Sequence, residues 1–418
     1  MAEAGKLITK PKVKIKVFGV GGGGNNVLIR MAEDNTLDID LVAVNTDQRK
    51  LQQVASVSED IQLVPIGEQL TRGRGTGGNV ALAERAARQE EARLREVIKG
   101  ADLIFITAGM GGGVGTGAAP VLASIAKKMG VLSIGVVTMP FSFEGRRKQK
   151  TAQLGMAALQ QEMDALIAVQ NDNIKQLPEN RSMTLMDAFK AADSVLRQSI
   201  TCVAQLILTT GVINVDFADV TAILRQSTSS DALLSIGRSK RGALDALQNA
   251  ISSPLVDKDV TAARGFILNL AGDESLTLWD VDAATSYIYE HTDPSVNIIL
   301  GTVIDPALKG EIQVTIIATD FVDCVMPQTA PAQDVAAPAS QTAGQSAAPA
   351  QTGAVAAGTA QAGTNAAGAA PAAQQPQPAP QVELEAPSFM RHPQPAQPST
   401  GAFAIPAFKL TPDHDEQK

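Results

Sequence analysis

The sequence predicts an α/β protein with a parallel-sheet domain, a long central helix, a smaller α+β domain and a disordered tail. Three observations predict this class. Apolar strand-like segments alternate with helical ones in the first half, which is typical of a parallel sheet covered on both faces. One helical pattern then runs over residues 182–209. Near residue 326 the composition changes, and large apolar residues become almost absent.

The first half contains four apolar segments that we expect to be strands. They cover residues 13–20, 40–47, 101–110 and 131–141. The glycine-rich stretch after the first strand leads into a helical segment at 27–34. An amphipathic helix is expected over 81–100, and another over 118–130 with Pro120 in its first turn and Gly130 at its end.

The pattern over 182–209 predicts one helix, because apolar residues recur at steps of three and four. The stripe consists of Leu185, Phe189, Ala192, Leu196, Ile200, Val203 and Ile207. A second compact region follows it. Its expected helices lie near 239–252 and 278–290, and its expected strands at 264–272, 296–304 and 311–321.

The segment from 326 to about 400 is rich in Ala, Pro, Gln, Gly, Ser and Thr, so it cannot bury enough apolar surface to fold. A flexible chain of about 75 residues spans roughly 50 Å, which makes this segment a tether. Apolar residues return in FAIPAFKL at 403–410. This peptide is either a frayed end or a docking motif on a long linker.

Composition excludes several classes of protein. The net charge of −8 argues against a protein that coats nucleic acid. Cys202 and Cys324 are too few for a disulfide framework, so we expect reduced thiols in a cytoplasmic protein. The three histidines are scattered and indicate no metal cluster. There is no signal-peptide pattern and no apolar run of about 20 residues, so a membrane role would require a partner.

Two glycine-rich loops carry the strongest chemical signal. GVGGGG at 19–24 fits GxGxxG, which alone suggests a dinucleotide fold and an oxidoreductase with Asp47 as the ribose-binding acid. That reading gives no role to GMGGGVGTG at 109–117. Two such loops at one sheet edge can hold different phosphates of one nucleoside triphosphate. A third cluster, at 70–79, either covers the terminal phosphate or is a surface loop.

Neither loop contains GxxxxGK[ST], so the chain is not a P-loop NTPase. No lysine is placed in the loops to neutralise the phosphates. Backbone amides, a helix N-terminus and Mg²⁺ held mainly by the phosphates must do so. We predict no metal-binding side chains.

The chain contains a series of motifs, which in chain order are GVGGGGNN, AVNTD, LTRG, GMGGG-GTGAAP, PF-FEG, FKAAD and NVDFADV. In these motifs the sequence resembles the FtsZ family of bacterial tubulin-like division GTPases. The resemblance covers residues 13 to about 320 and includes the linker and the terminal IPAF. It implies a tubulin-like fold with a GTP-binding domain. The implied regions are an N-terminal extension at 1–12, the GTP-binding domain at 13–181, the central helix and acidic loop at 182–221, the α+β domain at 222–322, the linker at 323–401 and a docking peptide at 402–418.

The resemblance also implies the parts of a GTP site. The phosphates would lie on Gly21, Gly22, Gly23, Gly24 and Asn25, and on Gly111, Gly112, Gly113, Val114, Gly115, Thr116 and Gly117. The ribose would lie near Glu144 and Lys148, although their spacing alone favours a surface ion pair. The base would stack on Phe189 and contact Asn171. A carboxylate at Asp193 would accept from N1–H and the 2-amino group of guanine, both of which adenine lacks.

The acidic motif NVDFADV implies a shared catalytic site. In the family, this loop reaches the nucleotide of the next subunit, so Asp216 and Asp219 would position and polarise the attacking water, and Asn214 would shape the loop. From the residues alone, Asp216 is equally a helix N-cap. Head-to-tail contacts of this kind do not close and therefore generate filaments.

The sequence departs from the family pattern near the nucleotide. Val114 replaces a threonine and loses its hydroxyl, and Lys148 replaces an arginine and loses bidentate geometry. We therefore expect a self-assembling GTPase of the division ring at mid-cell, beneath the membrane, with hydrolysis slowed by Val114. The alternative is a weakly hydrolysing structural or regulatory protein that co-assembles with another FtsZ. Ile405, Pro406 and Phe408 would dock on membrane-adaptor division proteins.

Overall fold

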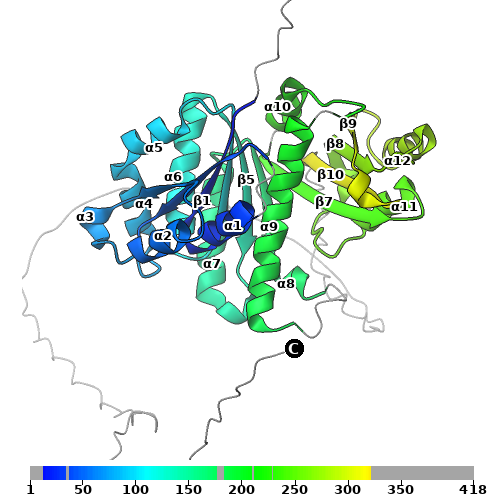
Figure 1. Cartoon of the computed structure of the whole chain (residues 1–418). Coiled ribbons are helices and arrows are strands. Elements are labelled where there is room, and N and C mark those ends of the chain that lie inside the picture. The colour runs from blue at the N-terminus through cyan, green and yellow to red at the C-terminus, as the bar shows by residue number, and fades with distance from the viewer. Residues whose placement is uncertain (1–12, 34–36, 177–182, 210, 228, 322–418) are drawn as a thin grey trace, which may run out of the picture. The chain divides into compact units, whose positions relative to one another are not determined.

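The computed structural model describes residues 13–33, 37–176, 183–209, 211–227 and 229–321 (Figure 1). The expected N-terminal extension, the linker and the docking peptide lie outside the described residues. In the described part, ten strands form one sheet in the order β3-β2-β1-β4-β5-β6-β7-β10-β8-β9. No helix in this part is both long and apolar enough to span a membrane.

The first six strands are parallel, as the sequence predicts. They are β1 (Ile15–Val20), β2 (Asp40–Asn45), β3 (Ile61–Pro65), β4 (Leu103–Gly109), β5 (Leu132–Met139) and β6 (Ala165–Gln170). Four of them were predicted as strands, whereas those at 61–65 and 165–170 were missed. Their side chains point alternately to two apolar clusters, so that Val17 belongs to one cluster and Phe18 to the other. Both faces of this half of the sheet are therefore buried.

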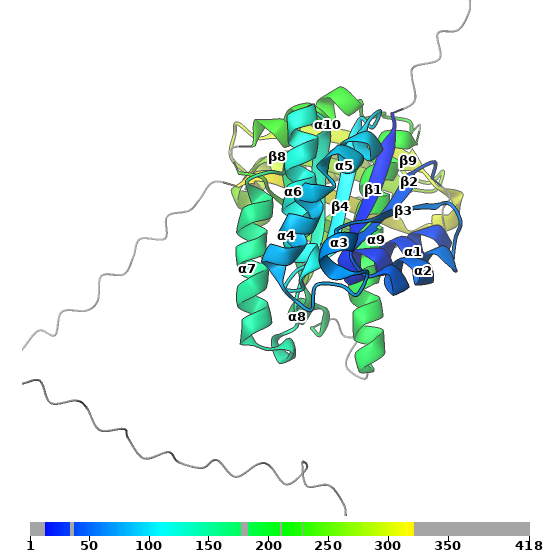
Figure 2. The same ribbon diagram turned by 90° about the vertical axis from the view of Figure 1, so that its left-hand side faces the viewer.

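Helices cover the two faces of the parallel half (Figure 2). The cluster around Val17 includes side chains of α1 (Gly21–Glu33), α2 (Gln48–Ala55) and α9 (Leu185–Leu208). The cluster around Phe18 includes side chains of α4 (Val80–Gln89), α5 (Glu91–Ile98), α6 (Val114–Met129) and α7 (Arg146–Gln160). The short helices α3 (Glu68–Thr71), η1 (Ser142–Glu144) and α8 (Asn171–Ile174) complete this domain.

Three helix predictions need correction. α1 begins at Gly21, so the glycine stretch is itself helical. α6 begins at Val114, which places Pro120 in its second turn rather than its first. The helix expected over 81–100 is two helices separated at Glu90. The glycines at the N-terminal ends of these helices allow close packing, since a Cβ on Gly24 would lie 2.3 Å from the Thr107 carbonyl oxygen.

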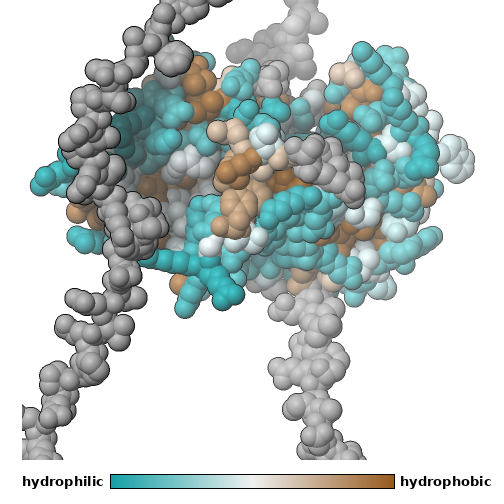
Figure 3. All heavy atoms as spheres, turned by 90° about the horizontal axis from the view of Figure 1, so that it is seen from below, coloured by the Kyte–Doolittle hydropathy of each residue, from teal (hydrophilic) through white to brown (hydrophobic). Residues whose placement is uncertain are grey.

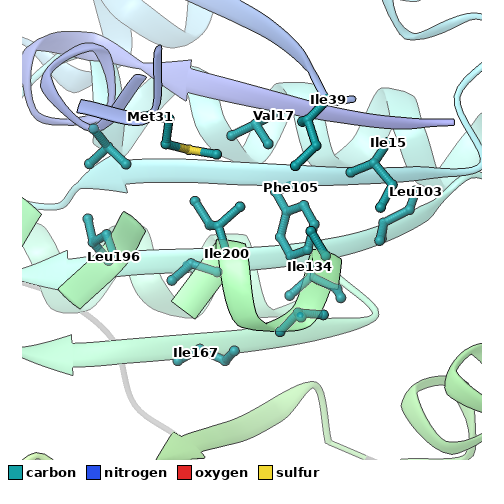
Figure 4. Packing of buried hydrophobic residues seen from close by; sticks show 14 of the residues in the cluster. Ile15, Val17, Met31, Ile39, Leu103, Phe105, Ile134, Ile167, Leu196 and Ile200 are labelled. Carbon is teal, nitrogen blue, oxygen red and sulfur yellow. The ribbon is translucent and has the colours of Figure 1, made fainter. Parts of the chain in front are cut away.

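The long central helix is confirmed as α9, which Thr184 caps by accepting from the Asp187 N–H. Leu196 and Ile200 point at the sheet, toward the strand residues Phe105 and Ile134 (Figure 4). The N-terminal end of the predicted stripe does not belong to this core, because Leu185 and Phe189 are exposed. The 24 residues of α9 give it a length of about 36 Å.

The C-terminal domain combines a sheet with helices, as predicted, although the strand at Asp231–Ser239 was not predicted. It contains α10 (Phe217–Gln226), β7 (Asp231–Ser239), α11 (Ala243–Ile251), η3 (Val260–Ala262), β8 (Ala263–Gly272), α12 (Leu278–His291), β9 (Asn297–Ile304), η4 (Pro306–Leu308) and β10 (Ile312–Phe321). β10 is antiparallel to β7 and β8, while β9 is parallel to β8. β7 joins the first half of the sheet through only Leu166↔Asp231 and Ile167↔Ala232.

Cys202 is a buried free thiol on α9. Burial raises the pKa of this thiol to about 11, so it stays protonated and unreactive at neutral pH. Cys324 lies outside the described residues.

Candidate functional site: a cavity between two glycine-rich loops

The β1–α1 and β4–α6 loops lie side by side, because β1 and β4 are neighbours and both end at the same edge of the parallel sheet. This is the lower edge in Figure 1, where α8 and the N-terminal end of α9 lie. A cavity of about 400 Å³ opens between the two loops. Its lining residues are Gly22, Gly23, Asn26, Thr76, Gly109, Met110, Gly112, Gly113, Val114, Gly115, Thr138, Pro140, Glu144, Lys148, Asn171, Phe189, Ala192 and Asp193.

The first glycine loop divides into lining and supporting residues. Gly22 and Gly23 line the cavity, and Gly21 adopts a positive φ of 74° at the start of α1. Asn25 is buried behind them, where its Nδ2 donates to the Gly19 carbonyl at 2.8 Å. Its Oδ1 accepts from Asn45 at 2.6 Å. Asn25 therefore holds the loop in place and does not line the cavity.

The second loop divides in the same way. Gly112, Gly113, Val114 and Gly115 line the cavity. Behind them, the Gly111 N–H donates to the Thr116 hydroxyl at 2.9 Å, which closes the turn. Gly117 packs against α4, where a Cβ would lie 2.3 Å from the Val80 carbonyl oxygen. This part of the loop is built by packing rather than by ligand contact.

Both loops start helices of more than ten residues, so two sets of unpaired backbone N–H groups meet at the cavity. The cavity also has room at the loops, because a Cβ on Gly22 or Gly112 would meet no protein atom within 4 Å. Two helix N-termini with accessible backbone form an environment that favours phosphate.

Glu144 and Lys148 form an ion pair on the wall of the cavity. Glu144 ends η1 and also accepts from the Phe141 backbone N–H at 2.9 Å, while Lys148 lies in the first turn of α7. The sequence allowed either a surface ion pair or a pair beside the ligand. The structure shows an ion pair that also lines the cavity.

One wall of the cavity is formed by α9 and the start of α8. Phe189 lies edge-on to Phe141, with ring centroids 5.4 Å apart. Asn171 is buried, and its Oδ1 accepts no hydrogen bond from any described residue. A buried amide oxygen without a partner is costly, so a ligand donor at this point would be stabilising.

Asp193 lies one turn after Phe189 and faces α1. Its Oδ2 is 3.3 Å from the Nε of Arg30. Burial raises the pKa of Asp193, and the charge and hydrogen bond of Arg30 act against that increase.

Several lining residues were not predicted as site residues. Thr138 is near the end of β5, the strand next to β4, and Pro140 directly follows that strand. The predicted adjacency of the two strands could have identified both residues. Thr76 belongs to the third glycine cluster and reaches the second loop, since a Cβ on Gly113 would lie 2.1 Å from its hydroxyl. The other lining residues that were missed are Asn26, Gly109, Met110 and Ala192.

Asp47, considered above as a ribose-binding acid, does not line the cavity. Its side chain caps α2 by accepting from the Arg49 N–H at 3.0 Å. Burial acts against its ionisation, but hydrogen bonds from Arg49 hold its pKa below the usual value.

The acidic loop lies away from the cavity. Asn214, Asp216 and Asp219 are exposed, and none of them lines it. They follow the C-terminal end of α9, whereas Phe189 lies near its N-terminal end. The rise of the helix from Phe189 to Leu208 is about 28 Å. Asn214 accepts from the Gly211 N–H at 2.6 Å and so shapes the loop, and Asp216 precedes α10 at the N-cap position.

Comparisons with known proteins agree with this architecture. The sequence matches the Tubulin/FtsZ family GTPase domain over residues 14–179 and the FtsZ family C-terminal domain over residues 230–322. The structure resembles FtsZ of M. jannaschii, with 38% sequence identity and a TM-score of 0.68. That similarity covers 74% of this chain and 88% of the archaeal one.

The chain belongs to the FtsZ family. The parallel half of its sheet is therefore a tubulin/FtsZ GTPase domain, and the oxidoreductase alternative is wrong.

More distant relatives share the fold. CetZ2 from Haloferax volcanii is 22% identical with a TM-score of 0.63, covering 74% of this chain and 94% of its own. CetZ1 from the same organism is 19% identical with a TM-score of 0.65, covering 74% and 95%. The tubulin-like fold is thus common to FtsZ and CetZ proteins and does not by itself distinguish them.

Val114, the departure from the FtsZ pattern, stands at the junction of the two loops. It is the first residue of α6, it is buried, and it lines the cavity. An added Cβ on Gly21 would lie 3.3 Å from the Val114 Cβ, so this side chain fills the space between the loops. The neighbouring Thr116 does not supply a hydroxyl to the cavity, because it does not line it, and its Oγ1 accepts from the Gly111 N–H.

Among the described residues, no three His, Cys, Asp or Glu side chains are grouped so that they could hold a metal ion.

Proposed function

We propose that this FtsZ-family protein binds GTP in the cavity, assembles head to tail, and hydrolyses GTP at the joint between two chains. The phosphates would lie on the two glycine loops, the ribose beside Glu144 and Lys148, and the guanine on Phe189 and Asp193. Asp216 and Asp219 of the next chain would polarise the attacking water, as Asn214 fixes their loop.

One observation carries this proposal: the acidic loop and the cavity are separated by about 28 Å of α9. A carboxylate must come within hydrogen-bond reach of the water that it polarises. The acids of one chain cannot reach the cavity of the same chain, whereas a second copy stacked end to end would bring them there.

Exposed apolar side chains at both ends support end-to-end assembly. The face around the N-terminal end of α9 shows apolar residues gathered near its middle (Figure 3). Phe143, Leu185 and Met186 are largely exposed there, and Val212 is exposed beside the acidic loop. Large exposed apolar groups mark interaction surfaces. The M. jannaschii relative is itself described as a dimer, and CetZ2 as a protofilament with GTPγS.

We assign the filament to the bacterial division ring in the cytoplasm, beneath the membrane at mid-cell. The assignment rests on the FtsZ family and on IPAF at 405–408, within the predicted docking peptide at 402–418. If Ile405, Pro406 and Phe408 dock on a membrane adaptor, deleting 402–418 will abolish adaptor binding in a pull-down and leave assembly intact. Unchanged adaptor binding would contradict this assignment.

The experiment that tests the function is phosphate release from GTP with Mg²⁺ over a range of protein concentrations, with light scattering recorded in parallel. We expect the rate per chain to rise above a critical concentration together with scattering. A rate per chain that is independent of concentration would contradict a shared site.

A second function is favoured by Val114. A filament that forms with GTP but hydrolyses it poorly would serve as a structural or regulatory partner of another FtsZ. Scattering with little phosphate release in the same experiment would support this alternative.

A further inference from the structure

An ion pair at the α9 wall of the cavity links α1 to α9. The Arg30 Nε lies 3.3 Å from Asp193 Oδ2, and the two side chains are 28% and 15% exposed. Arg30 does not line the cavity, whereas Asp193 does. Arg30 is therefore placed to act on a bound nucleotide through Asp193 rather than by direct contact.

We propose that Arg30 is a positioning residue, which holds the Asp193 carboxylate ionised and oriented so that the cavity selects guanine over adenine. This inference rests on the proposed GTP site.

The geometry leaves Asp193 able to bind a base while it is paired. An ionised carboxylate has about four acceptor positions on its two oxygens. Arg30 occupies one of them, on Oδ2. The remaining positions can accept from N1–H and the 2-amino group of guanine. Asn26, one turn before Arg30 on α1, lines the cavity, so the same helix face runs from the cavity wall to the ion pair.

The charge state of Asp193 decides which purine fits. The ionised form only accepts, and guanine presents two donors. A protonated carboxyl donates once and accepts once, which matches N1 and the 6-amino group of adenine. Burial raises the pKa of Asp193 and so favours the protonated form, while Arg30 favours the ionised form. Loss of Arg30 would therefore shift the binding preference of the cavity from guanine toward adenine.

Charged groups on the cavity walls and on α8 are paired with each other. Glu144 is paired with Lys148 across η1 and α7, and Asp172 is paired with Lys175 on α8.

On α9 itself, Lys190 is 3.6 Å from Asp187, and Arg197 lies one turn beyond Asp193. From α1, Arg30 supplies the cation that contacts Asp193. It is therefore the group whose removal should change the ionisation of Asp193 most.

The test measures binding of GDP, IDP and ADP to the full chain by calorimetry, over about pH 5 to pH 8. Diphosphates are used because they have no γ-phosphate that the protein could hydrolyse during the measurement. The variants are Arg30→Met, which keeps the apolar stem, and Arg30→Lys, which keeps the charge. Arg95→Met is the matched control, because Arg95 pairs with Glu91 at the same 3.3 Å distance on α5 and does not line the cavity.

We expect Arg30→Met to lower the ratio of GDP to ADP affinity about tenfold near neutral pH, because loss of the cation increases the protonated fraction of Asp193. The sign of the pH effect follows from the carboxylate. GDP binding is present above the pKa of Asp193 and is lost as the pH falls through it. Because Arg30→Met raises that pKa further, its loss of GDP binding will begin at a higher pH. Arg30→Lys will restore most of the ratio, and Arg95→Met will leave it unchanged.

Two results would overturn the proposal. One is an Arg30→Met variant with the same GDP-to-ADP ratio and pH profile as the parent chain. The other is an equal loss of GDP and ADP affinity, which would mean that Arg30 only maintains the fold. Failure of the proposed function has a different signature, since the parent chain itself would then not prefer GDP over ADP. The IDP measurement isolates the 2-amino group, so the GDP-to-IDP ratio should fall with the GDP-to-ADP ratio.

Discussion

Replacing Asp219 with asparagine is expected to lower the rate of GTP hydrolysis about 100- to 10,000-fold, the range for a positioned acid–base group. GTP affinity should stay the same, because the cavity of the same chain lies about 28 Å away along α9. Asp219 is the better target of the two acids, since Asp216 stands at the N-cap position of α10. The measurement is phosphate release at saturating GTP, with nucleotide binding measured separately. Asp60→Asn is the matched control, an exposed aspartate in the segment between α2 and β3.

Mixing two inactive variants will show whether the acids act in trans. Gly112→Glu puts a negative charge on the second loop, where a Cβ meets no protein atom within 4 Å, so it should block phosphate binding without a clash. This variant keeps its acidic loop, and Asp219→Asn keeps its cavity. In a random equimolar mixture, about a quarter of the joints pair the two intact halves. Hydrolysis should therefore rise well above the sum of the separate variants; a rate equal to that sum would contradict a trans site.

Replacing Val114 with threonine is expected to raise GTP turnover about 10- to 100-fold, because a hydrogen bond to a charged group contributes about 1.5–3 kcal/mol. The new hydroxyl would stand between the two loops, where Val114 now fills the space beside Gly21. Turnover and GTP affinity should be measured separately, so that an effect of the hydroxyl on catalysis is distinguished from an effect on binding. Val114→Ala is the control, since it removes both methyl groups of the valine without adding a hydroxyl. If the threonine and alanine variants turn over GTP equally, the hydroxyl has no role in this chain.

The fold was predictable where apolar periodicity was strong. The buried strands next to the two loops and the central helix were identified because burial on both faces leaves a continuous apolar run. Helix starts were not predictable in the glycine stretches. Glycine usually indicates a loop, yet Gly24 and Gly117 lie in helices. These helical positions require glycine because a Cβ would collide with backbone oxygens.

The glycine loops of the site were predictable from the sequence, but many of the residues that other elements contribute to it were not. Spacing along the chain identified the glycine loops, which line the cavity through Gly22 and Gly112. Arg30 could not have been found in this way. Its partner Asp193 is 163 residues away, and only the packing of α1 on α9 brings the two together. Which glycines support the loops and which face the cavity is also set by tertiary packing.

The placement of the cavity and the acidic loop at opposite ends of α9 gives the proposed filament a direction. A row of chains has one fewer completed site than it has chains, because the last cavity at one end meets no acids. Nucleotide bound there can leave and be replaced, while nucleotide inside the row is enclosed. At the other end, an acidic loop faces solvent without a substrate. The two tips are therefore chemically unlike, and growth and loss of subunits should follow different rate laws at each.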